Sequence, residues 1–373
     1  MADRNGALRV AVDAGPLRGI RTGIRNSVEW SLEALENRRR TDAPDHPLVT
    51  PYVVSLRSAL HAGERRIPLP AASAHRLWAQ RWSPPVDRAL GRPDVVHGTN
   101  YVVPPARAAR LVTVHDCWFL EHPRDADPGL APVASALRRA IERGAHVVTC
   151  SDATTARVRA LFEVRSVSTV HHGPPAPVTA ASSPPPGVDR PAPFVLALGT
   201  IERRKNVTAL IDAFGRVASS HPTVELRLVG RDGDDAEAVG RSIDRLGDDA
   251  RRRVVRHEQV DDGTKRWFLE HASVLAYPSL DEGFGFPILE AQQTGTPVVA
   301  STAGSIPEVA GDGALLSDPH DTISLADHLS ATLESDTVRH ELVARGRRNL
   351  ERFSWERSAD ELVHLYHRVA DDA

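Results

Sequence analysis

The chain has 373 residues, enough for two domains of ordinary size, and 41% of them are hydrophobic, so it can bury real cores. Its formal net charge of −3 argues against nucleic-acid binding, and two cysteines argue against a disulfide framework. The start lacks the apolar core of a signal peptide, and no apolar run reaches the length of about 20 residues that spans a bilayer. We therefore expect a cytoplasmic protein whose membrane contact is at most peripheral.

Short apolar runs alternate with helical patterns along both halves of the chain. Strands are expected at 8–14, 49–56, 94–97, 111–115, 146–150, 194–198, 224–229, 254–256, 274–277 and 297–300. Helices are expected at 27–39, 207–219, 288–294 and about 355–370. Continuous apolar runs between helices are typical of parallel strands buried on both faces. The pattern predicts an α/β protein with two open, doubly wound sheets.

A proline-rich segment interrupts this series, with eight prolines in residues 174–193. Such a segment continues neither a helix nor a sheet. We expect a first domain at 1–178, a linker at 179–193, a second domain at 194–353 and a final helix at 354–373. That helix has one apolar face, which must be buried (Leu362, Leu365, Tyr366 and Val369).

The loop after the expected strand 274–277 reads Pro-Ser-Leu-Asp-Glu-Gly-Phe-Gly-Phe-Pro. Gly283 and Gly285 permit close backbone approaches, Pro287 suits the first turn of a helix, and Gly295 suits its end. In parallel sheets, ligands bind at the carboxyl ends of strands. Free N–H groups of this loop, together with the helix N-terminus, suit an anion such as a pyrophosphate.

Two carboxylates, Glu282 and Glu290, frame this loop. A carboxylate repels a phosphate, so both are better suited to accepting hydrogen bonds from hydroxyl groups of a sugar or a ribose. Taken singly, each could equally be a surface acid or an acid that stabilises the helix N-terminus. The ordered string as a whole favours a binding site.

This string, followed by Gly-Thr-Pro-Val-Val-Ala at 295–300, resembles the donor-site signature of the family-four retaining glycosyltransferases. The match includes both glutamates at the family's spacing of eight, and the resemblance is strongest over 194–309. It implies the GT-B fold, with two Rossmann-like domains facing across a cleft. The first domain would bind the acceptor, the second would bind the donor, and the final helix would cross back to the first.

A second polar loop, Gly199-Thr-Ile-Glu-Arg-Arg-Lys-Asn206, follows the expected strand 194–198. The cations of Arg204 and Lys205 suit a diphosphate leaving group, whose charge grows as the glycosidic bond breaks. The alternative is a solvated charged turn, but the loop is very similar to the family's phosphate-binding stretch. Lys205 and Lys265 are the chain's only lysines, which favours a specific role for Lys205.

The first half contributes weaker signals. Gly15, Gly19 and Gly23 do not follow the nicotinamide-site spacing, and Asn26 or Ser27 is expected to cap the next helix. The alternative reading of this glycine loop is simple flexibility. By resemblance, the loop lies over the donor diphosphate, and Gly23 is its best match.

Two histidines follow strands of the first half. His97 is equally open to a structural role or to binding a sugar hydroxyl. For His115 the resemblance implies a place beside the transferred sugar, with Asp116 orienting it. His97, Asn100 and Asp116 are candidates for binding the acceptor.

No metal site is expected. The pair His171-His172 lacks ligands at zinc spacing, Asp125 and Asp127 do not follow a strand, and Asp232, Asp234 and Asp235 lack the spacing of a calcium loop. Metal independence is consistent with Arg204 and Lys205 neutralising the diphosphate. Trp78 and Trp82 are expected to pack inside, although a patch facing an acceptor or a membrane is the alternative.

The resemblance implies a glycosyltransferase that moves a hexose or deoxyhexose from a nucleotide-diphosphate sugar to an acceptor hydroxyl, with retention, no cofactor and no metal. Catalysis is assigned to His115, Glu282, Arg204 and Lys205. The alternatives are a nucleotide-sugar epimerase or hydrolase and a non-catalytic binding protein. A small molecule, a glycan or a lipid-linked sugar fits as acceptor, and the base, the sugar and the oligomeric state are open. The implied donor-binding residues are Gly23, Gly199, Thr200, Arg204, Lys205, Gly230, Glu282, Gly283, Phe284, Gly285 and Glu290.

Overall fold

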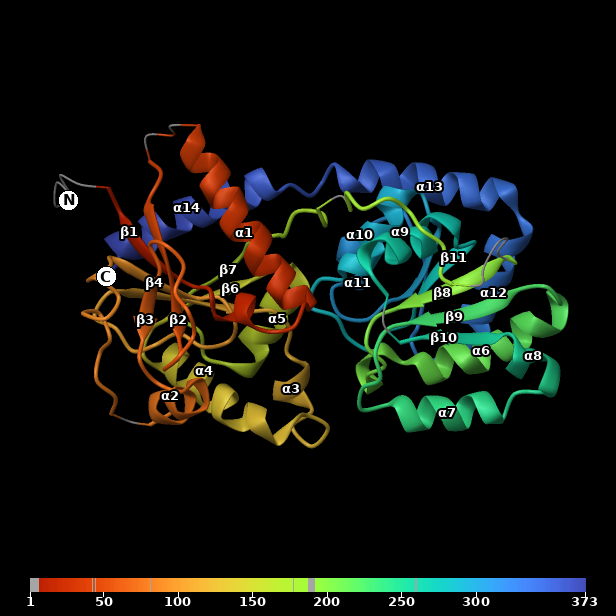
Figure 1. The fold of residues 1–373 in the computed structure, drawn as a ribbon, viewed down its shortest axis with the longest axis horizontal. Coiled ribbons are helices and arrows are strands. Elements are labelled where there is room, and N and C mark those ends of the chain that lie inside the picture. The colour runs from red at the N-terminus through yellow and green to blue at the C-terminus, as the bar shows by residue number, and fades with distance from the viewer. Residues whose placement is uncertain are drawn as a thin grey trace. The chain divides into compact units, whose positions relative to one another are not determined.

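The computed structural model describes residues 7–41, 43, 45–80, 82–176, 178–186, 192–258 and 260–373. The chain forms two units (Figure 1). Unit 1 comprises Met1–Gly173 and Ser354–Ala373, and unit 2 comprises Pro174–Phe353. Of the expected linker 179–193, residues 187–191 lie outside the described part of the chain.

Unit 1 is built on a parallel sheet, which has seven strands within the described residues, in the order β3-β2-β1-β4-β5-β6-β7. β1 lies at its centre and pairs with β2 on one side and β4 on the other, with Val10 beside Val49 and Val95. The three-residue strands β3 and β7 were not expected from the sequence, because so short a run carries little apolar pattern. The strands are β1 (Arg9–Asp13), β2 (Leu48–Val54), β3 (Arg65–Ile67), β4 (Val95–Gly98), β5 (Ala109–Val114), β6 (His146–Thr149) and β7 (Val167–Thr169).

Helices cover both faces of this sheet. Val10 and Val12 pack with α1 (Gly23–Arg40) and α14 (Trp355–Asp371), whereas Ala11, on the opposite face, packs with α2 (Ala71–Trp78) and α4 (Ala131–Glu142). This alternation follows from the two-residue period of a strand. The short helices α3 (Trp118–Glu121) and α5 (Asp152–Leu161) complete the unit, with the 3₁₀ turns η1 (Gly15–Arg18) and η2 (Pro128–Leu130).

The start of α1 corrects one expectation. Thr22 is its N-cap, with its hydroxyl accepting from the Arg25 amide at 3.2 Å, so Asn26 and Ser27 lie inside the helix. The final helix agrees with its pattern, since Leu362, Leu365, Tyr366 and Val369 are all buried against the sheet of unit 1. α14 therefore packs on strands that precede it by more than 200 residues.

Unit 2 repeats the design with a parallel sheet in the order β10-β9-β8-β11-β12-β13. α6 (Val207–Ser220), α7 (Ala236–Asp244) and α12 (Thr322–Glu334) pack on one face. The other face carries α9 (Asp262–His271), α10 (Phe286–Thr294) and α11 (Ile306–Ala310). The remaining elements are β8 (Phe194–Leu198), β9 (Glu225–Val229), β10 (Val254–His257), β11 (Val274–Tyr277), β12 (Val298–Ser301), β13 (Leu315–Ser317), η3 (Arg203–Lys205), α8 (Asp248–Arg252) and α13 (Asp336–Leu350).

The two tryptophans of interest behave differently. Trp78 is buried at the end of α2, as expected, but Trp82 is 78% exposed, so the expectation that it packs inside is wrong. Among the helices that the structure describes, none is long and apolar enough to cross a membrane.

Candidate active site

The loops that follow β8 and β11 in unit 2 are joined by hydrogen bonds. Asn206 has a left-handed backbone (φ 55°), and its side-chain amide donates to the carbonyls of Pro278 (3.1 Å) and Pro319 (2.8 Å). The Leu280 amide donates to the Arg204 carbonyl at 2.8 Å. These bonds bring Arg204 and Lys205 against the loop that carries Glu282, 77 residues or more away in sequence.

Glu282 lies between the two cations. Its Oε2 is 2.5 Å from Arg204 Nη1, and its Oε1 is 2.6 Å from Lys205 Nζ. The Lys205 ammonium also donates to the Tyr277 hydroxyl at 3.0 Å and lies 4.9 Å from the centre of that ring. The sequence assigned the cations and the glutamate to different parts of a ligand, whereas in this structure they bind one another.

The buried position of this cluster sets its ionisation. Burial by itself raises the pKa of Glu282, but Arg204 and Lys205 outweigh that effect and hold the pKa at about 2. Burial lowers the pKa of Lys205 from its usual range, and Glu282 opposes that shift. We infer an ionised cluster at neutral pH, in which one carboxylate satisfies two cations.

Glu290 has a different partner. It sits on α10, and its Oε1 is 2.6 Å from Nζ of Lys265 on α9. Its other oxygen, Oε2, is buried and has no hydrogen-bond partner within the described residues. A buried carboxylate oxygen without a donor is costly, so it indicates a hydroxyl or amide group that a ligand supplies.

The Ser305 side chain fixes the glycine loop between these glutamates. The Ser305 hydroxyl lies 2.9 Å from the carbonyls of both Glu282 and Phe284, and Phe284 is buried. Gly285, with φ 106°, turns the chain into α10, which has proline in its first turn and ends at Gly295 with φ 75°. The loop and helix geometry expected from the sequence is therefore present, although Gly283 is not among the glycines with positive φ.

Gly199, Thr200 and Gly230 lie in the neighbouring loops after β8 and β9. Gly230 has φ 155°, and a Cβ there would lie 1.9 Å from the Gly199 carbonyl oxygen. Only glycine fits this close approach of two backbones. The residue therefore shapes the loop by which Thr200 and Arg204 are placed.

In unit 1, His115 is buried at the end of β5. Its Nε2 donates to the Thr99 carbonyl at 2.8 Å, and burial lowers its pKa, so the ring is neutral with Nδ1 as its accepting nitrogen. The Asp116 carboxylate accepts from the Trp118 amide at 3.1 Å. The carbonyl of Thr99, rather than Asp116, therefore orients His115.

The acceptor-binding hypothesis for His97 is corrected by its contacts. The ring is buried, with Nδ1 2.8 Å from the Tyr366 hydroxyl and Nε2 2.8 Å from Thr113 Oγ1. Both nitrogens are thus used inside unit 1, where they tie α14 to the sheet. Asn100 differs, because its Oδ1 is buried and lacks a hydrogen-bond partner in the part of the chain that the structure describes.

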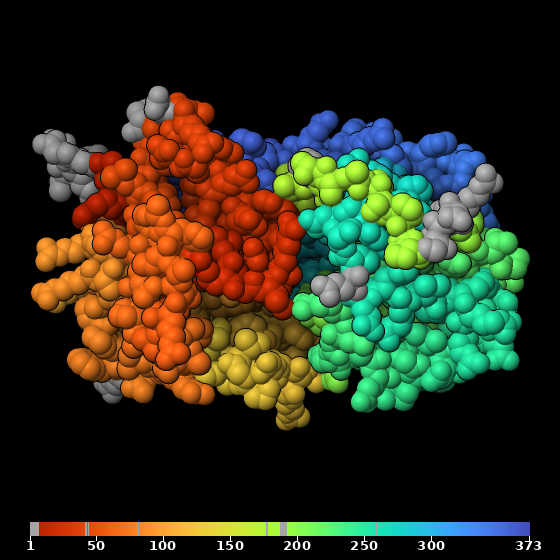
Figure 2. All heavy atoms as spheres, viewed as in Figure 1, coloured from red at the N-terminus to blue at the C-terminus, as the bar shows by residue number. Residues whose placement is uncertain are grey.

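Gly23 is the first residue of α1, next to an exposed stretch at 19–22. This stretch belongs to the red segment on the surface of unit 1 in Figure 2. The expected place of Gly23 over a diphosphate stays a prediction.

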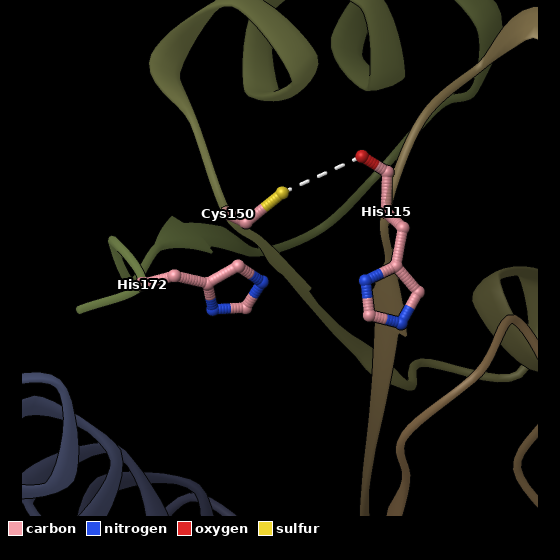
Figure 3. Close-up of side chains that lie close together, drawn as sticks. All are labelled: His115, Cys150 and His172. Atoms are coloured by element: carbon pink, nitrogen blue, oxygen red, sulfur yellow. Dashed lines mark hydrogen bonds between the residues drawn. The ribbon is translucent and has the colours of Figure 1, made fainter. Parts of the chain in front are cut away.

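Three potential metal ligands meet in unit 1. His115, Cys150 and His172 are buried, and their ligand atoms lie within 4.8 Å of one another (Figure 3). The Cys150 thiol donates to the His115 carbonyl at 3.4 Å, and His172 stacks on Trp355. No local motif predicts this group, because its members come from three separate strand ends. Two imidazoles and a thiol form a donor set that suits a soft cation such as Zn²⁺.

The aspartates that the sequence analysis rejected as metal ligands have hydrogen-bond or ion-pair partners within the protein. Asp127 caps the turn η2, Asp234 accepts from the Arg203 amide at 2.9 Å, and Asp232 pairs with Arg256. Each of these three aspartates therefore has a local structural role.

Comparison with known proteins matches residues 180–349 to the family described as Glycosyl transferases group 1. The matched segment of the chain belongs to this family. The protein is a nucleotide-sugar-dependent glycosyltransferase, and its two parallel α/β sheets have the GT-B fold.

Curated relatives include two mannosyltransferases. The chain is 27% identical to "O-antigen chain mannosyltransferase B" of Escherichia coli, over 73% of this chain and 74% of the relative. It is 35% identical to "Phosphatidyl-myo-inositol mannosyltransferase" of Mycobacterium tuberculosis over 49% of each chain, so the match spans about half of that relative.

Solved structures resemble the whole chain at low identity. Sucrose-phosphate synthase from Thermosynechococcus elongatus superposes with a TM-score of 0.71 at 19% identity, covering 98% of this chain and 100% of that one. The lipopolysaccharide glycosyltransferase WaaG superposes with a TM-score of 0.70 at 18% identity, covering 96% and 99%.

Several residues of this glycosyltransferase's candidate site were not predicted from the sequence. Tyr277 and Ser305 carry no motif signal of their own, because a strand-end tyrosine and a loop serine are common. Lys265 did carry a signal, since it is one of two lysines in the chain. It received no role because it lies 25 residues from Glu290 in sequence.

Proposed function

We propose that this glycosyltransferase moves a hexose or deoxyhexose from a nucleotide-diphosphate sugar to an acceptor hydroxyl, with retention of configuration and without a metal ion. The observation that carries the proposal is the cluster of Arg204, Lys205 and Glu282 beside the Gly283–Gly285 loop. It combines two cations, backbone N–H groups and a carboxylate at the carboxyl ends of β8 and β11.

The donor diphosphate would compete with Glu282 for the two cations. Two negative charges on a diphosphate outweigh the single charge of a carboxylate, so Arg204 and Lys205 turn to the phosphates and Glu282 becomes available to sugar hydroxyls. As the glycosidic bond breaks, negative charge grows on the leaving phosphate, and the fixed cations stabilise it. Glu290, with its unpartnered Oε2, accepts a hydrogen bond from a ribose hydroxyl.

The acceptor side is assigned to unit 1. The neutral His115, with Nδ1 as an accepting nitrogen, and Asn100, with an unpartnered Oδ1, offer hydrogen bonds suited to hydroxyl groups. Both named curated relatives are mannosyltransferases, which makes mannose the first sugar to test and a glycan or a lipid-linked molecule the first acceptor.

The test starts with a panel of nucleoside diphosphates in a thermal-shift assay. The diphosphate that stabilises the enzyme most identifies the base, and the matching nucleotide sugars are then supplied with and without candidate acceptors. We expect product only when an acceptor is present, with the donor's anomeric configuration seen by NMR. Donor consumption that needs no acceptor would support the epimerase or hydrolase alternative instead.

Metal independence needs its own assay. Treatment with a chelator is expected to leave transfer unchanged, because Arg204 and Lys205 neutralise the diphosphate. The His115–Cys150–His172 group is the place to check if activity falls. Cys150→Ser would then reproduce the loss, whereas Cys117→Ser, at the other buried cysteine, would not.

A further inference from the structure

Lysine occurs twice in this chain, and each lysine pairs with one of the two glutamates of the donor-site string. Lys205 Nζ is 2.6 Å from Glu282 Oε1, and Lys265 Nζ is 2.6 Å from Glu290 Oε1. All other cationic side chains of the chain, apart from histidine, are arginine. The first lysine belongs to the proposed phosphate site, but the second has no role in it.

Lys265 is held on a rigid support. It lies in the first turn of α9, whose N-cap Asp261 accepts from the Thr264 amide at 2.7 Å. The following residues Trp267 and Phe268 are buried in the core of unit 2. α9 also contacts α10, the helix that carries Glu290. The ammonium group therefore meets the carboxylate from a fixed direction.

The pairing leaves one oxygen of Glu290 open. Lys265 occupies Oε1, whereas Oε2 is buried and without a partner within the described residues. An ammonium is a point charge that binds one oxygen, but a guanidinium commonly binds both oxygens of a carboxylate in a fork. Lysine is thus the cation that fixes Glu290 and still leaves Oε2 to a ligand.

We propose that Lys265 is a positioning residue for the donor nucleotide. It fixes the rotamer of Glu290, so that Oε2 accepts a hydrogen bond from a ribose hydroxyl. The inference rests on the proposed function, because it takes the ligand of Glu290 to be the ribose of a nucleoside diphosphate.

Isothermal titration calorimetry with guanosine and uridine diphosphates, and with their dideoxyribose counterparts, tests this role. Lys265→Met is expected to weaken the preferred ribonucleotide about tenfold, the size of one lost charge-assisted hydrogen bond. It should leave the dideoxy counterpart's affinity at the wild-type value. Adding Glu290→Gln should cause no further loss, since both changes remove the same contact.

Companion variants make the result decisive. Lys265→Arg should keep the wild-type thermal midpoint but still bind the ribonucleotide more weakly, because the fork covers Oε2. Arg266→Met, the next residue on α9 and paired with Glu270, is the matched control and should bind as wild type. Lys265→Gln replaces Lys265→Met if the latter unfolds.

Three outcomes would overturn the proposal. They are an equal loss for the ribo- and dideoxy-nucleotides, unchanged ribonucleotide binding by Lys265→Met, or wild-type binding by Lys265→Arg. Failure of the proposed function gives a different pattern, in which the wild type binds no nucleoside diphosphate or Glu290→Gln leaves ribonucleotide binding intact.

Discussion

The two units share one architecture but satisfy their polar site residues in opposite ways. Each is a parallel sheet with its candidate residues at the carboxyl ends of strands. In unit 2 these residues are charged and bind one another, as Glu282 does with Arg204 and Lys205. In unit 1 the buried rings of His97 and His115 are neutral and bind a hydroxyl or a carbonyl. A charged loop suits a phosphate ligand, whereas a neutral one suits hydroxyl groups.

The largest expected effect comes from removing the two cations of the unit 2 cluster. Replacing Arg204 and Lys205 together with alanine should lower kcat/KM by about 10³-fold or more, because removing a single preorganised donor commonly costs 10²–10³. Arg203→Ala is the control, since Arg203 is exposed in the same turn. Wild-type donor affinity and turnover in the double variant would disprove the phosphate assignment.

The next effect separates chemistry from nucleotide binding. Glu282→Gln should lower kcat by about 10²-fold, if this carboxylate meets the sugar in the transition state. It should leave the affinity for the nucleoside diphosphate unchanged or higher, because both cations lose their competitor. Stability should fall by about 3 kcal/mol, since the variant leaves two partly buried cations without their counter-charge. Calorimetry and steady-state kinetics check the three signs, and a loss of nucleotide affinity as large as the loss of kcat would contradict the assignment.

The difference between the units also explains what the sequence could predict. The loop geometry of unit 2 follows from local patterns, such as Gly285 ahead of Pro287 and Gly295 at the end of α10. The ion pairs of unit 2 do not follow from local patterns, because Glu282 lies 78 residues from Arg204 in sequence. The same sequence is equally compatible with cations that bind only a ligand. In unit 1, His97 follows a strand just as His115 does, so position alone could not separate them. Tyr366, 269 residues away, decides its structural role.

Acid should destabilise the two units over different pH ranges. Burial lowers the pKa of His97 and of His172 to about 3, from 6.5 for an ordinary histidine. The unfolded chain therefore takes up protons first, and the stability that these two histidines contribute to unit 1 should fall as pH decreases from about 6.5 towards 3, by about 2 kcal/mol per histidine at pH 5. Glu282 has a lowered pKa of about 2 against 4.5, so its contribution is lost only as pH falls below 4.5. Calorimetric scans at pH 7 and pH 5 should shift the transition of unit 1 more than that of unit 2, in which burial lowers the pKa of His257 as well, and equal shifts of both units would contradict this difference.

The smallest effect tests whether unit 1 uses His97 for structure only. His97→Phe removes two buried hydrogen bonds but fills the same space, and it leaves the hydroxyls of Tyr366 and Thr113 without their partner. The unfolding free energy should fall by about 1–3 kcal/mol at pH 7, as expected for buried polar groups left unsatisfied. Tyr366→Phe removes one of the same bonds from the α14 side, so the double variant should lose less than the sum of the two single losses. The KM for the acceptor should stay at its wild-type value in all three variants, since His97 has no free nitrogen for a ligand. If His97→Phe raises the KM for the acceptor and leaves the unfolding free energy unchanged, His97 binds the acceptor, as proposed for His115.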